Sequence, residues 1–491
     1  MSDTQQNISV RRMFGREQLF TNENVITKTN IAKVLGTEIA TAWAKNQTDI
    51  KYLYRYFRGN QPALYRTKEI RSDICNQVIE NRAKEIVDFK VGYICGSPIQ
   101  YISRDVDDRV TDSIDELNAL METEGKSTKD RELIEWQMIC GTGYRLVVPS
   151  DRQDSDVPFE IYTLDPRNAF VIYSNTYQKK PLAGVFFTNT IPELGQDGTV
   201  LTTPVYEVYT ETEYIKLEGD KVVKVIPHNL GMIPIIEYPA NPERMGAFEA
   251  VLPLLDALNT LDCNRLDGIE QFIQSLIILY NCELPEEENA TSLQAKGLIE
   301  LKSKGDAKAD IKILSEQLNQ SETETLKADL LSAIREIAGI PAQGDGSSSD
   351  SSNNGAALTK NGWEHCETHA KAFELTFKES EIRMLKLVLR ICEDMTDINL
   401  KVRELDIHFT RRNYENLLVK SQVLTTMLSN DKIAPKLAFE ASGLFTDPEG
   451  AYAESMKWYD SQKPEIPVEE TTLDEPTVVV EENNNDEVSE I

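Results

Sequence analysis

The sequence predicts an α+β protein in which a strand-rich region precedes three long helices. Residues 144–239 carry short runs of β-branched and aromatic residues separated by Pro, Gly, Asn and Asp, a pattern typical of antiparallel strands. Residues 246–280, 321–339 and 356–395 instead repeat apolar side chains every three or four positions, which indicates amphipathic helices. The chain of 491 residues is 40% hydrophobic, so it can bury substantial cores.

The region before the strands is predicted to be helical. Residues 69–94 place Ile74, Val78 and Ile86 near helical spacing with charged residues between them, and Gly96-Ser97-Pro98 ends the pattern. No apolar run reaches the ~18 residues that a bilayer-spanning helix needs. The first twenty residues also lack the pattern of a secretory signal. We therefore expect a cytosolic protein.

Two segments follow the strands. Residues 246–280 are predicted to form one long helix with a wet surface, because polar residues take up much of its circumference: Asp256, Asn259, Asp262, Asp267, Glu270 and Gln274. Residues 298–314 resemble two short strands joined by a polar turn. Four lysines recur across this pair: Lys302, Lys304, Lys308 and Lys312. They indicate either a solvated hairpin with interleaved aspartates or a patch that faces phosphates.

A polar loop separates the second and third long helices. Residues 340–366 read IPAQGDGSSSDSSNNGAALTKNGWEHC, and this stretch has too few apolar side chains to offset its ordering entropy by burial. Such a loop is either a connector or a moving part with a function. The side chains singled out in it are Gln343, Asp345, Ser347, Ser348, Ser349, Asp350, Asn353 and Asn354.

The chain is strongly acidic. Its formal net charge is −29, from 52 Lys and Arg against 81 Asp and Glu. This balance argues against a nucleic-acid binder that gains its affinity by neutralising phosphates. Residues 460–491 hold eleven acidic residues and one lysine in a low-complexity segment that we expect to be disordered. Residues 411–459, which precede this tail, have the pattern of a small helical region.

No pattern for catalysis or cofactor binding stands out. Seven scattered cysteines without a CxxC pair indicate reduced core residues rather than a disulfide or zinc framework. His365 and His369 could share a metal on one helix face, but Cys366 stands where a zincin has Glu, and polar-face histidines are the simpler interpretation. The phosphate-loop, dinucleotide-binding and nucleophile-elbow motifs are missing. We therefore predict no cofactor, no metal and no enzymatic activity.

Six stretches stand out in order along residues 50–395. They are YLYRYFRGNQ (52–61), NRAKEIVDFKVGYICGSPIQY (81–101), GTGYRLVVPSD (141–151), PFEIYTLDPRNAFVIYSN (158–175), IPIIEYPANPERMGAFEAVLPLLDALNTLDCNRLDGIEQF (233–272), and IREIAGIPAQ with NGAAL (334–343, 354–358). As an ordered set they resemble the portal protein of tailed bacteriophages, of the siphophage type from Gram-positive hosts. Beyond about residue 400 the likeness is one of composition only.

The resemblance implies a portal-type subunit with recognisable parts. These are an N-terminal arm (1–49), an α/β wing (50–241) completed by a long helix (356–395), a two-helix stem (242–280 and 321–339), a small strand-containing clip (281–320), a tunnel loop (340–355), a helical crown (396–459) and a disordered acidic tail (460–491).

The resemblance also implies a function and partners. Twelve copies would form a ring at one capsid vertex of the virion, after assembly in the host cytoplasm. Double-stranded DNA would pass through this channel without sequence specificity, driven in by the terminase large subunit and later released. The clip, with its four lysines, would contact DNA or dock terminase and later the head-to-tail adaptor. Major capsid and scaffolding proteins would be further partners, and no membrane would be involved.

The resemblance places the tunnel loop against the DNA. Small side chains would grip no phosphate, and Asp345 and Asp350 would repel the duplex within the screening length of about 8 Å, so that DNA slides past. A protein of a different class is the alternative, namely a cytosolic hydrolase with residues 341–355 as its active-site lid. That hypothesis predicts a pocket with convergent polar groups near the loop.

Overall fold

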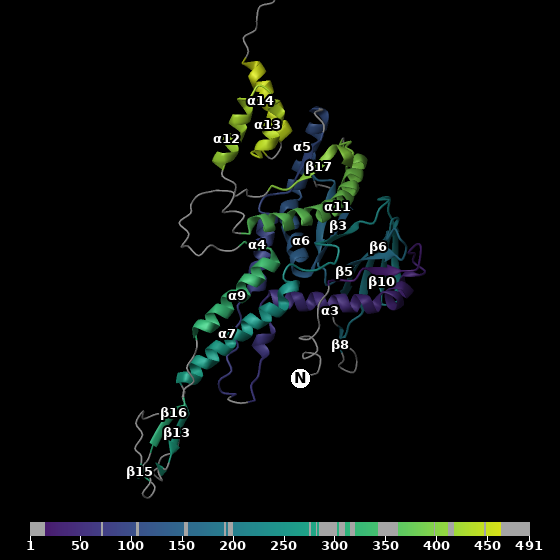
Figure 1. Cartoon of the computed structure of the whole chain (residues 1–491). Coiled ribbons are helices and arrows are strands. Elements are labelled where there is room, and N and C mark those ends of the chain that lie inside the picture. The colour runs from purple at the N-terminus through teal and green to yellow at the C-terminus, as the bar shows by residue number, and fades with distance from the viewer. Residues whose placement is uncertain are drawn as a thin grey trace, which may run out of the picture. The chain divides into compact units, whose positions relative to one another are not determined.

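The structure is a computed structural model (Figure 1). It describes residues 15–69, 72–104, 108–151, 156–190, 193–194, 200–273, 276–280, 282–283, 302–303, 310–314, 320–341, 362–396, 398–410, 417–445 and 448–462. The chain divides into two compact units, one ending at Asn416 and the other beginning at Leu417. None of the described helices combines the length and the apolar character that a membrane span requires.

The first unit contains both helices and sheets, which confirms the predicted α+β class. Its helices are α2 (Ile31–Lys33), a π-helical turn η1 (Val34–Glu38), α3 (Ala40–Phe57), a 3-10 turn η2 (Pro62–Tyr65), α4 (Arg82–Ile94), α5 (Asp108–Thr123), α6 (Lys126–Cys140), a 3-10 turn η3 (Glu249–Val251), α7 (Leu252–Ile273), α9 (Gln320–Ala338), α11 (Trp363–Met395) and a 3-10 turn η4 (Val402–Glu404).

The predicted strand-rich region forms most of two sheets. The larger has six strands in the order β1 (Leu19–Thr21), β5 (Ala169–Ser174), β6 (Pro181–Asn189), β9 (Pro204–Tyr209), β10 (Glu213–Glu218) and β11 (Lys221–Pro227). The smaller has the order β12 (Ile235–Pro239), β3 (Thr142–Pro149) and β4 (Phe159–Leu164). In these two sheets only the β1–β5 pair is parallel, so the prediction of mostly antiparallel strands is confirmed.

Smaller strand pairs complete the first unit. They are β2 (Gln100–Ser103) with β17 (Leu405–His408), β7 (Glu193–Leu194) with β8 (Val200–Leu201), β13 (Leu276–Tyr280) with β16 (Asp310–Leu314), and β14 (Cys282–Glu283) with β15 (Lys302–Ser303). The pairing of β17 with β2 ties the chain after α11 back to the segment before α5.

The predicted helix over residues 69–94 is too long, since only α4 is helical there. Residues 75–80 instead run without regular structure along α7. A side chain at the boundary explains where the helix starts, because the Asn81 side chain accepts a hydrogen bond from the Lys84 amide and so caps α4.

Two further predictions need correction. The helix expected over residues 246–280 ends at Ile273, and Leu276–Tyr280 forms β13 instead. Residues 298–314 do contribute two strands, β15 and β16, but these do not pair with each other, since β16 pairs with β13 and β15 with β14. The run Leu-Ile-Ile-Leu-Tyr is compatible with either a helix or a strand, and its pairing with a distant segment decides for the strand.

The larger core lies between the helices and the three-stranded sheet. Leu53 of α3, Ile86 of α4, Leu133 of α6, Leu255 of α7 and Leu387 of α11 are all buried in it. A second core fills one face of the six-stranded sheet. The cysteines described are free, five of them buried and Cys75 half-buried, which confirms the prediction of reduced core residues.

The second unit is a small helical bundle, as its sequence predicted. It contains α12 (Leu417–Leu428), α13 (Pro435–Ser442) and α14 (Pro448–Ser461). Phe439 stacks on Phe445 with ring centroids 5.2 Å apart, and Lys420 donates a hydrogen bond of 2.8 Å to the Gly443 carbonyl at the end of α13. The acidic residues 463–491 lie outside the described part of the chain.

Candidate functional site

Two long helices, α7 and α9, lie side by side in Figure 1. On α9, Ile334 and Ala338 are buried, and Lys327 bonds both Asp262 of α7 (2.8 Å) and Glu80. The pair is therefore held by an apolar contact near the end of α9 and by a bridging lysine closer to its start.

An irregular segment crosses α7 and takes up its polar side chains. The backbone amide of Asn76 donates to Asp267 (2.7 Å), and the amide of Glu80 donates to Asn259 (2.8 Å). Asn259 and Asp267 are buried, so the prediction that they face water is wrong. Burial opposes ionisation of Asp267, but hydrogen bonds from Lys68 and Asn76 hold its pKa below the ordinary value. Sequence periodicity alone could not have identified these side chains as partners of another segment.

The helix α9 also carries apolar side chains that the chain itself does not cover. Leu326 is 50% exposed and Ile337 is 52% exposed. Leu330 and Ala333 lie between them, half-buried, and the four positions are spaced by 4, 3 and 4 residues along one face of the helix. We call Leu326, Leu330, Ala333 and Ile337 the stem stripe. Ile334 and Ala338 face the chain's own core on a different side of α9.

The predicted loop begins and ends at one point of the structure. Gly339 follows α9 with φ +66°, and Gly362 precedes α11 with φ +78°. A Cβ atom added to Gly362 would lie 3.7 Å from Cα of Pro341, so the chain leaves at residue 341 and returns beside it at residue 362. Both glycines adopt the left-handed conformation that other residues disfavour, which fixes the directions of departure and return.

Aromatic side chains brace this loop base. The ring of Trp363 lies 5.9 Å from that of Tyr93 and 6.2 Å from that of Phe89, both on α4. The Tyr93 hydroxyl donates a 2.7 Å hydrogen bond to Glu367 on the first turns of α11. The start of α11 is thus anchored on α4, and the loop base has a rigid support.

The two predicted polar-face histidines belong to the same base. The rings of His365 and His369 lie 4.5 Å apart, and the His369 ring is 3.3 Å from where a Cβ of Gly339 would be. Burial lowers the pKa of His369, and the charges of Lys90 and His365 act in the same direction. Among the described residues no group of three or more His, Cys, Asp or Glu side chains could hold a metal ion.

Replacing Gly339 by alanine should destabilise the loop base. The left-handed backbone costs about 1–2 kcal/mol for a residue with a Cβ, and the new methyl group would press on His369 at 3.3 Å. We expect faster hydrogen exchange at the start of α11 and easier proteolysis between residues 341 and 362. Gly92→Ala in α4 is the control, because a Cβ there meets nothing within 4 Å. Equal effects of both variants would contradict a special role of Gly339.

The singled-out site residues are only partly placed. The loop residues Gln343, Asp345, Ser347, Ser348, Ser349, Asp350, Asn353 and Asn354 lie outside the described residues, as do Lys304 and Lys308. Lys302 belongs to β15, opposite Glu283 in the register, and Lys312 belongs to β16, opposite Ile278.

A buried ionic cluster holds the long helix α11 against the smaller sheet. It consists of Tyr101, Lys126, Asp130, Arg145, Tyr238 and Glu381. Glu381 on α11 accepts from Lys126 (2.8 Å), Arg145 (3.3 Å) and both tyrosine hydroxyls (2.7 Å each). Asp130 accepts from Lys126 and Arg145 at 2.5 Å each. Four elements, β2, α6, β3 and β12, therefore converge on one carboxylate of α11.

The electrostatics of this cluster favour its ionised form. Burial opposes the charge on Glu381, but Lys126 and Arg145 lower its pKa to about 2. Arg145 is fully buried, and its pKa is raised because the surrounding anionic groups outweigh the cost of its burial. The carboxylate therefore stays charged at neutral pH, and this cluster orients a helix rather than exchanging protons.

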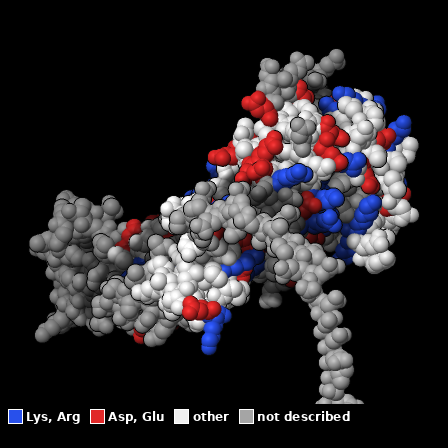
Figure 2. All heavy atoms as spheres, turned by 90° about the horizontal axis from the view of Figure 1, so that it is seen from above, with Lys and Arg blue, Asp and Glu red and all other residues white. Residues whose placement is uncertain are grey.

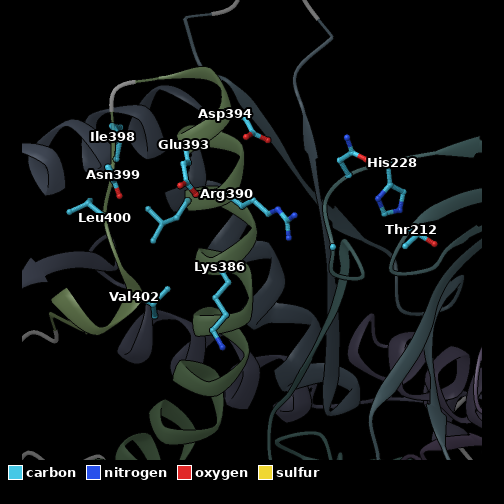
Figure 3. A pocket seen from close by; sticks show the side chains of 13 residues that line it. Thr212, His228, Lys386, Arg390, Glu393, Asp394, Ile398, Asn399, Leu400 and Val402 are labelled. Atoms are coloured by element: carbon cyan, nitrogen blue, oxygen red, sulfur yellow. The ribbon is translucent and has the colours of Figure 1, made fainter.

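A pocket of about 850 Å³ lies at the far end of α11 (Figure 3). Lys386, Arg390, Glu393 and Asp394 project from the helix, and the Arg390 side chain points towards His228 on the sheet side. A Cβ on Gly231 would meet the Arg390 guanidinium at 2.2 Å, so this turn fits closely around it. Gly362, where the described chain resumes after the loop, precedes the opposite end of α11, and no residue near it lines this pocket.

Taken in order, these features define a structural subunit. An α/β body anchors a long helix, a helix pair carries an uncovered apolar stripe and continues into short strands, and a loop has a braced base. A family comparison then gives the identity: the model for phage portal proteins, SPP1 Gp6-like, matches residues 37–467, and the chain belongs to this family. The resemblance stated from the sequence is confirmed, and the hydrolase alternative has no support. No curated protein matches the chain significantly.

The family gives the chain its role. It is a portal protein of a phage capsid, located at the capsid vertex where DNA is packaged and ejected. Portal proteins of this family are structural, and they form oligomeric rings that interact with the capsid, the terminase and DNA.

Proposed function

We propose that twelve copies of this chain close into the portal ring through their helix pairs. The stem stripe on α9 is the observation that carries this proposal. Burying apolar side chains is favourable, by about 25 cal/mol for each Å² removed from water. Leu326 and Ile337 remain half in solvent in the single chain, so a second copy has apolar surface left to cover.

The placement of the stripe suits a ring rather than a closed dimer. The stripe occupies a different side of α9 from Ile334 and Ala338, which pack within the chain. On α7, Leu266 is 40% exposed and offers an apolar position for a neighbour. An interface between two different surfaces leaves each copy free to bind on both sides, and it closes into a ring when the rotation between copies allows.

The subunit count and the assembly state have a direct test. Purified protein should give ring-shaped particles in negative stain, and views down the axis should show twelve subunits. Monomers or dimers under all salt conditions would overturn the proposal, whereas rings with another number would correct only the count.

We further propose roles for the parts of the subunit. The helix pair forms the stem, and the strands between residues 276 and 314 form the clip that docks the terminase large subunit and later the head-to-tail adaptor. Lys302, Lys304, Lys308 and Lys312 contribute to that docking or to local DNA contact. The wing meets the major capsid and scaffolding proteins, and the second unit forms the crown. The chain itself carries out no catalysis, and it assembles in the host cytoplasm.

The tunnel loop, residues 340–355, is proposed to face the DNA. Its support is a base at which the described chain stops after Pro341 and resumes beside it at Gly362. The side chains of residues 341–355 are small, polar or acidic, and they offer a passing duplex little to grip.

Reversing the charge of this loop should hinder packaging. Asp345→Lys combined with Asp350→Lys would place new cations in the loop of every subunit. The DNA phosphates would then bind to the loop instead of sliding past it. We expect normal rings but less packaged DNA per capsid, measured by nuclease-protected DNA in an assembly assay. Asp345→Asn with Asp350→Asn is the control, since it removes charge without adding any. An unchanged packaging yield with the lysines would show that loop charge plays no part.

A further inference from the structure

A basic hollow lies beside the C-terminal end of α3. It has a volume of about 590 Å³ and is lined by Lys51 and Arg55 of α3 and by Arg58 directly after the helix. Its other walls include Asp165, Arg167 and Asn168 from the turn between β4 and β5. The Tyr56 hydroxyl bonds Asp256 of α7 at 2.9 Å, and the Tyr56 ring stacks on Phe248 at 5.9 Å. These two contacts hold the end of α3 in place, and with it the cations that line the hollow.

The three cations of α3 have no anionic partner in the described part of the chain. Lys51, Arg55 and Arg58 are exposed, and their side chains form no hydrogen bond or ion pair with described residues. Some other exposed cations are paired within the chain, as Lys84 is with Asp88 at 2.9 Å and Arg383 with Glu379 at 2.6 Å. In a chain of net charge −29, three neighbouring cations without carboxylates form a local positive patch.

Arg167, which also lines this hollow, already has an anionic partner and an aromatic contact. Arg167 is held by Asp165 through its Nε at 2.9 Å, and its guanidinium stacks 4.4 Å above the Tyr54 ring. Gln47 of α3 donates a 2.9 Å hydrogen bond to the Arg167 carbonyl, which ties the turn to the helix. Since Arg167 is occupied, the charge available to a partner comes from Lys51, Arg55 and Arg58.

The geometry favours a protein carboxylate over DNA. The three cations are spaced by 4 and 3 residues, so they follow one face of α3 over about 10 Å. A hollow of this volume is within the range that accommodates a small ligand or a few side chains. Glutamate and aspartate side chains of an extended segment can enter it, whereas a stiff duplex meets proteins along broad exposed surfaces.

We propose that this basic hollow docks an acidic segment of the shell protein that surrounds the portal ring. The inference rests on the proposed function, because it takes the chain to be a ring in contact with the capsid. Lys51, Arg55 and Arg58 would pair with carboxylates of that segment, and arginine forks suit such pairs well. The repeated hollow around the ring would multiply a weak single contact.

Charge reversal provides the test. The variant K51E/R55E/R58E would be purified as the full chain and immobilised as rings, and binding of the purified shell protein of the same phage would be measured over a salt series. We expect normal rings and binding at least about tenfold weaker, which corresponds to about 1.4 kcal/mol. Wild-type binding should weaken as salt rises.

The control variant K28E/K221E/K224E makes the same change in net charge at exposed lysines elsewhere. It should bind the shell protein like the wild type. If the K51E/R55E/R58E rings bound the shell protein as tightly as the wild type, or if the control lost as much binding, the inference would be overturned.

Other outcomes would identify a different occupant. If the K51E/R55E/R58E rings lost binding to a short DNA duplex but kept shell binding, the hollow would be assigned to DNA instead. If deleting residues 463–491 strengthened shell binding by rings with the native hollow but not by K51E/R55E/R58E rings, the chain's own acidic tail would be the occupant and the inference would be overturned. Failure of the wild type to form rings would instead overturn the proposed function.

Discussion

Replacing Glu381 by glutamine is expected to lower the free energy of unfolding by about 3–5 kcal/mol. The substitution keeps the volume of the side chain but removes the charge that Lys126 and Arg145 both contact. Those two cations are almost fully buried, so water cannot replace the lost hydrogen bonds and negative charge. Asp130 alone would face two positive charges, and α11 would lose its main polar attachment to the sheet.

The effect can be measured by urea denaturation, with hydrogen exchange of β3 and α11 as a local readout. The control is Glu379→Gln, because Glu379 is 70% exposed and pairs with Arg383 only as an i,i+4 contact on the same helix. Such exposed pairs contribute about 0.3–0.5 kcal/mol. A loss in the Glu381 variant no greater than in the control would mean that the cluster adds nothing to the anchoring of α11.

The second large effect is expected on assembly. Leu326→Asp combined with Ile337→Asp would place two carboxylates on the stem stripe, where our proposal buries apolar side chains between copies. A buried charge without a partner costs several kcal/mol, and the cost would recur at each interface of the ring. We therefore expect folded monomers in place of rings, as seen by light scattering and negative stain.

Folding of this variant should be little affected, because both side chains are half exposed in the single chain. Circular dichroism and thermal melting can check this point. Val223→Asp on β11 is a matched control, since Val223 is 56% exposed but lies on the edge of the six-stranded sheet. Rings that form normally from the double variant would refute the stem stripe as the interface.

The distribution of charge on the surface could not be predicted from the composition. The net charge predicted an acidic protein, yet Lys and Arg side chains gather beside Asp and Glu on the face seen in Figure 2. Likewise, Arg55 and Arg58 belong to the stretch YLYRYFRGNQ and Lys51 directly precedes it, but nothing in their spacing placed Arg167 and Asp165 beside them. The charge of a local surface depends on which segments lie next to each other after folding, and the net charge of the chain does not reveal this.

The sequence by itself determined the helices α9 and α11, the antiparallel strands of the two main sheets and the family. These follow from residue periodicity, turn residues and ordered motifs, which are local properties of the chain. Tertiary structure alone decided that residues 75–80 lie along α7, that β13 is a strand, and that Glu381 collects two cations and two tyrosines. The physical reason is that buried polar groups and short apolar runs take their state from partners distant in sequence, and those partners become neighbours only after folding.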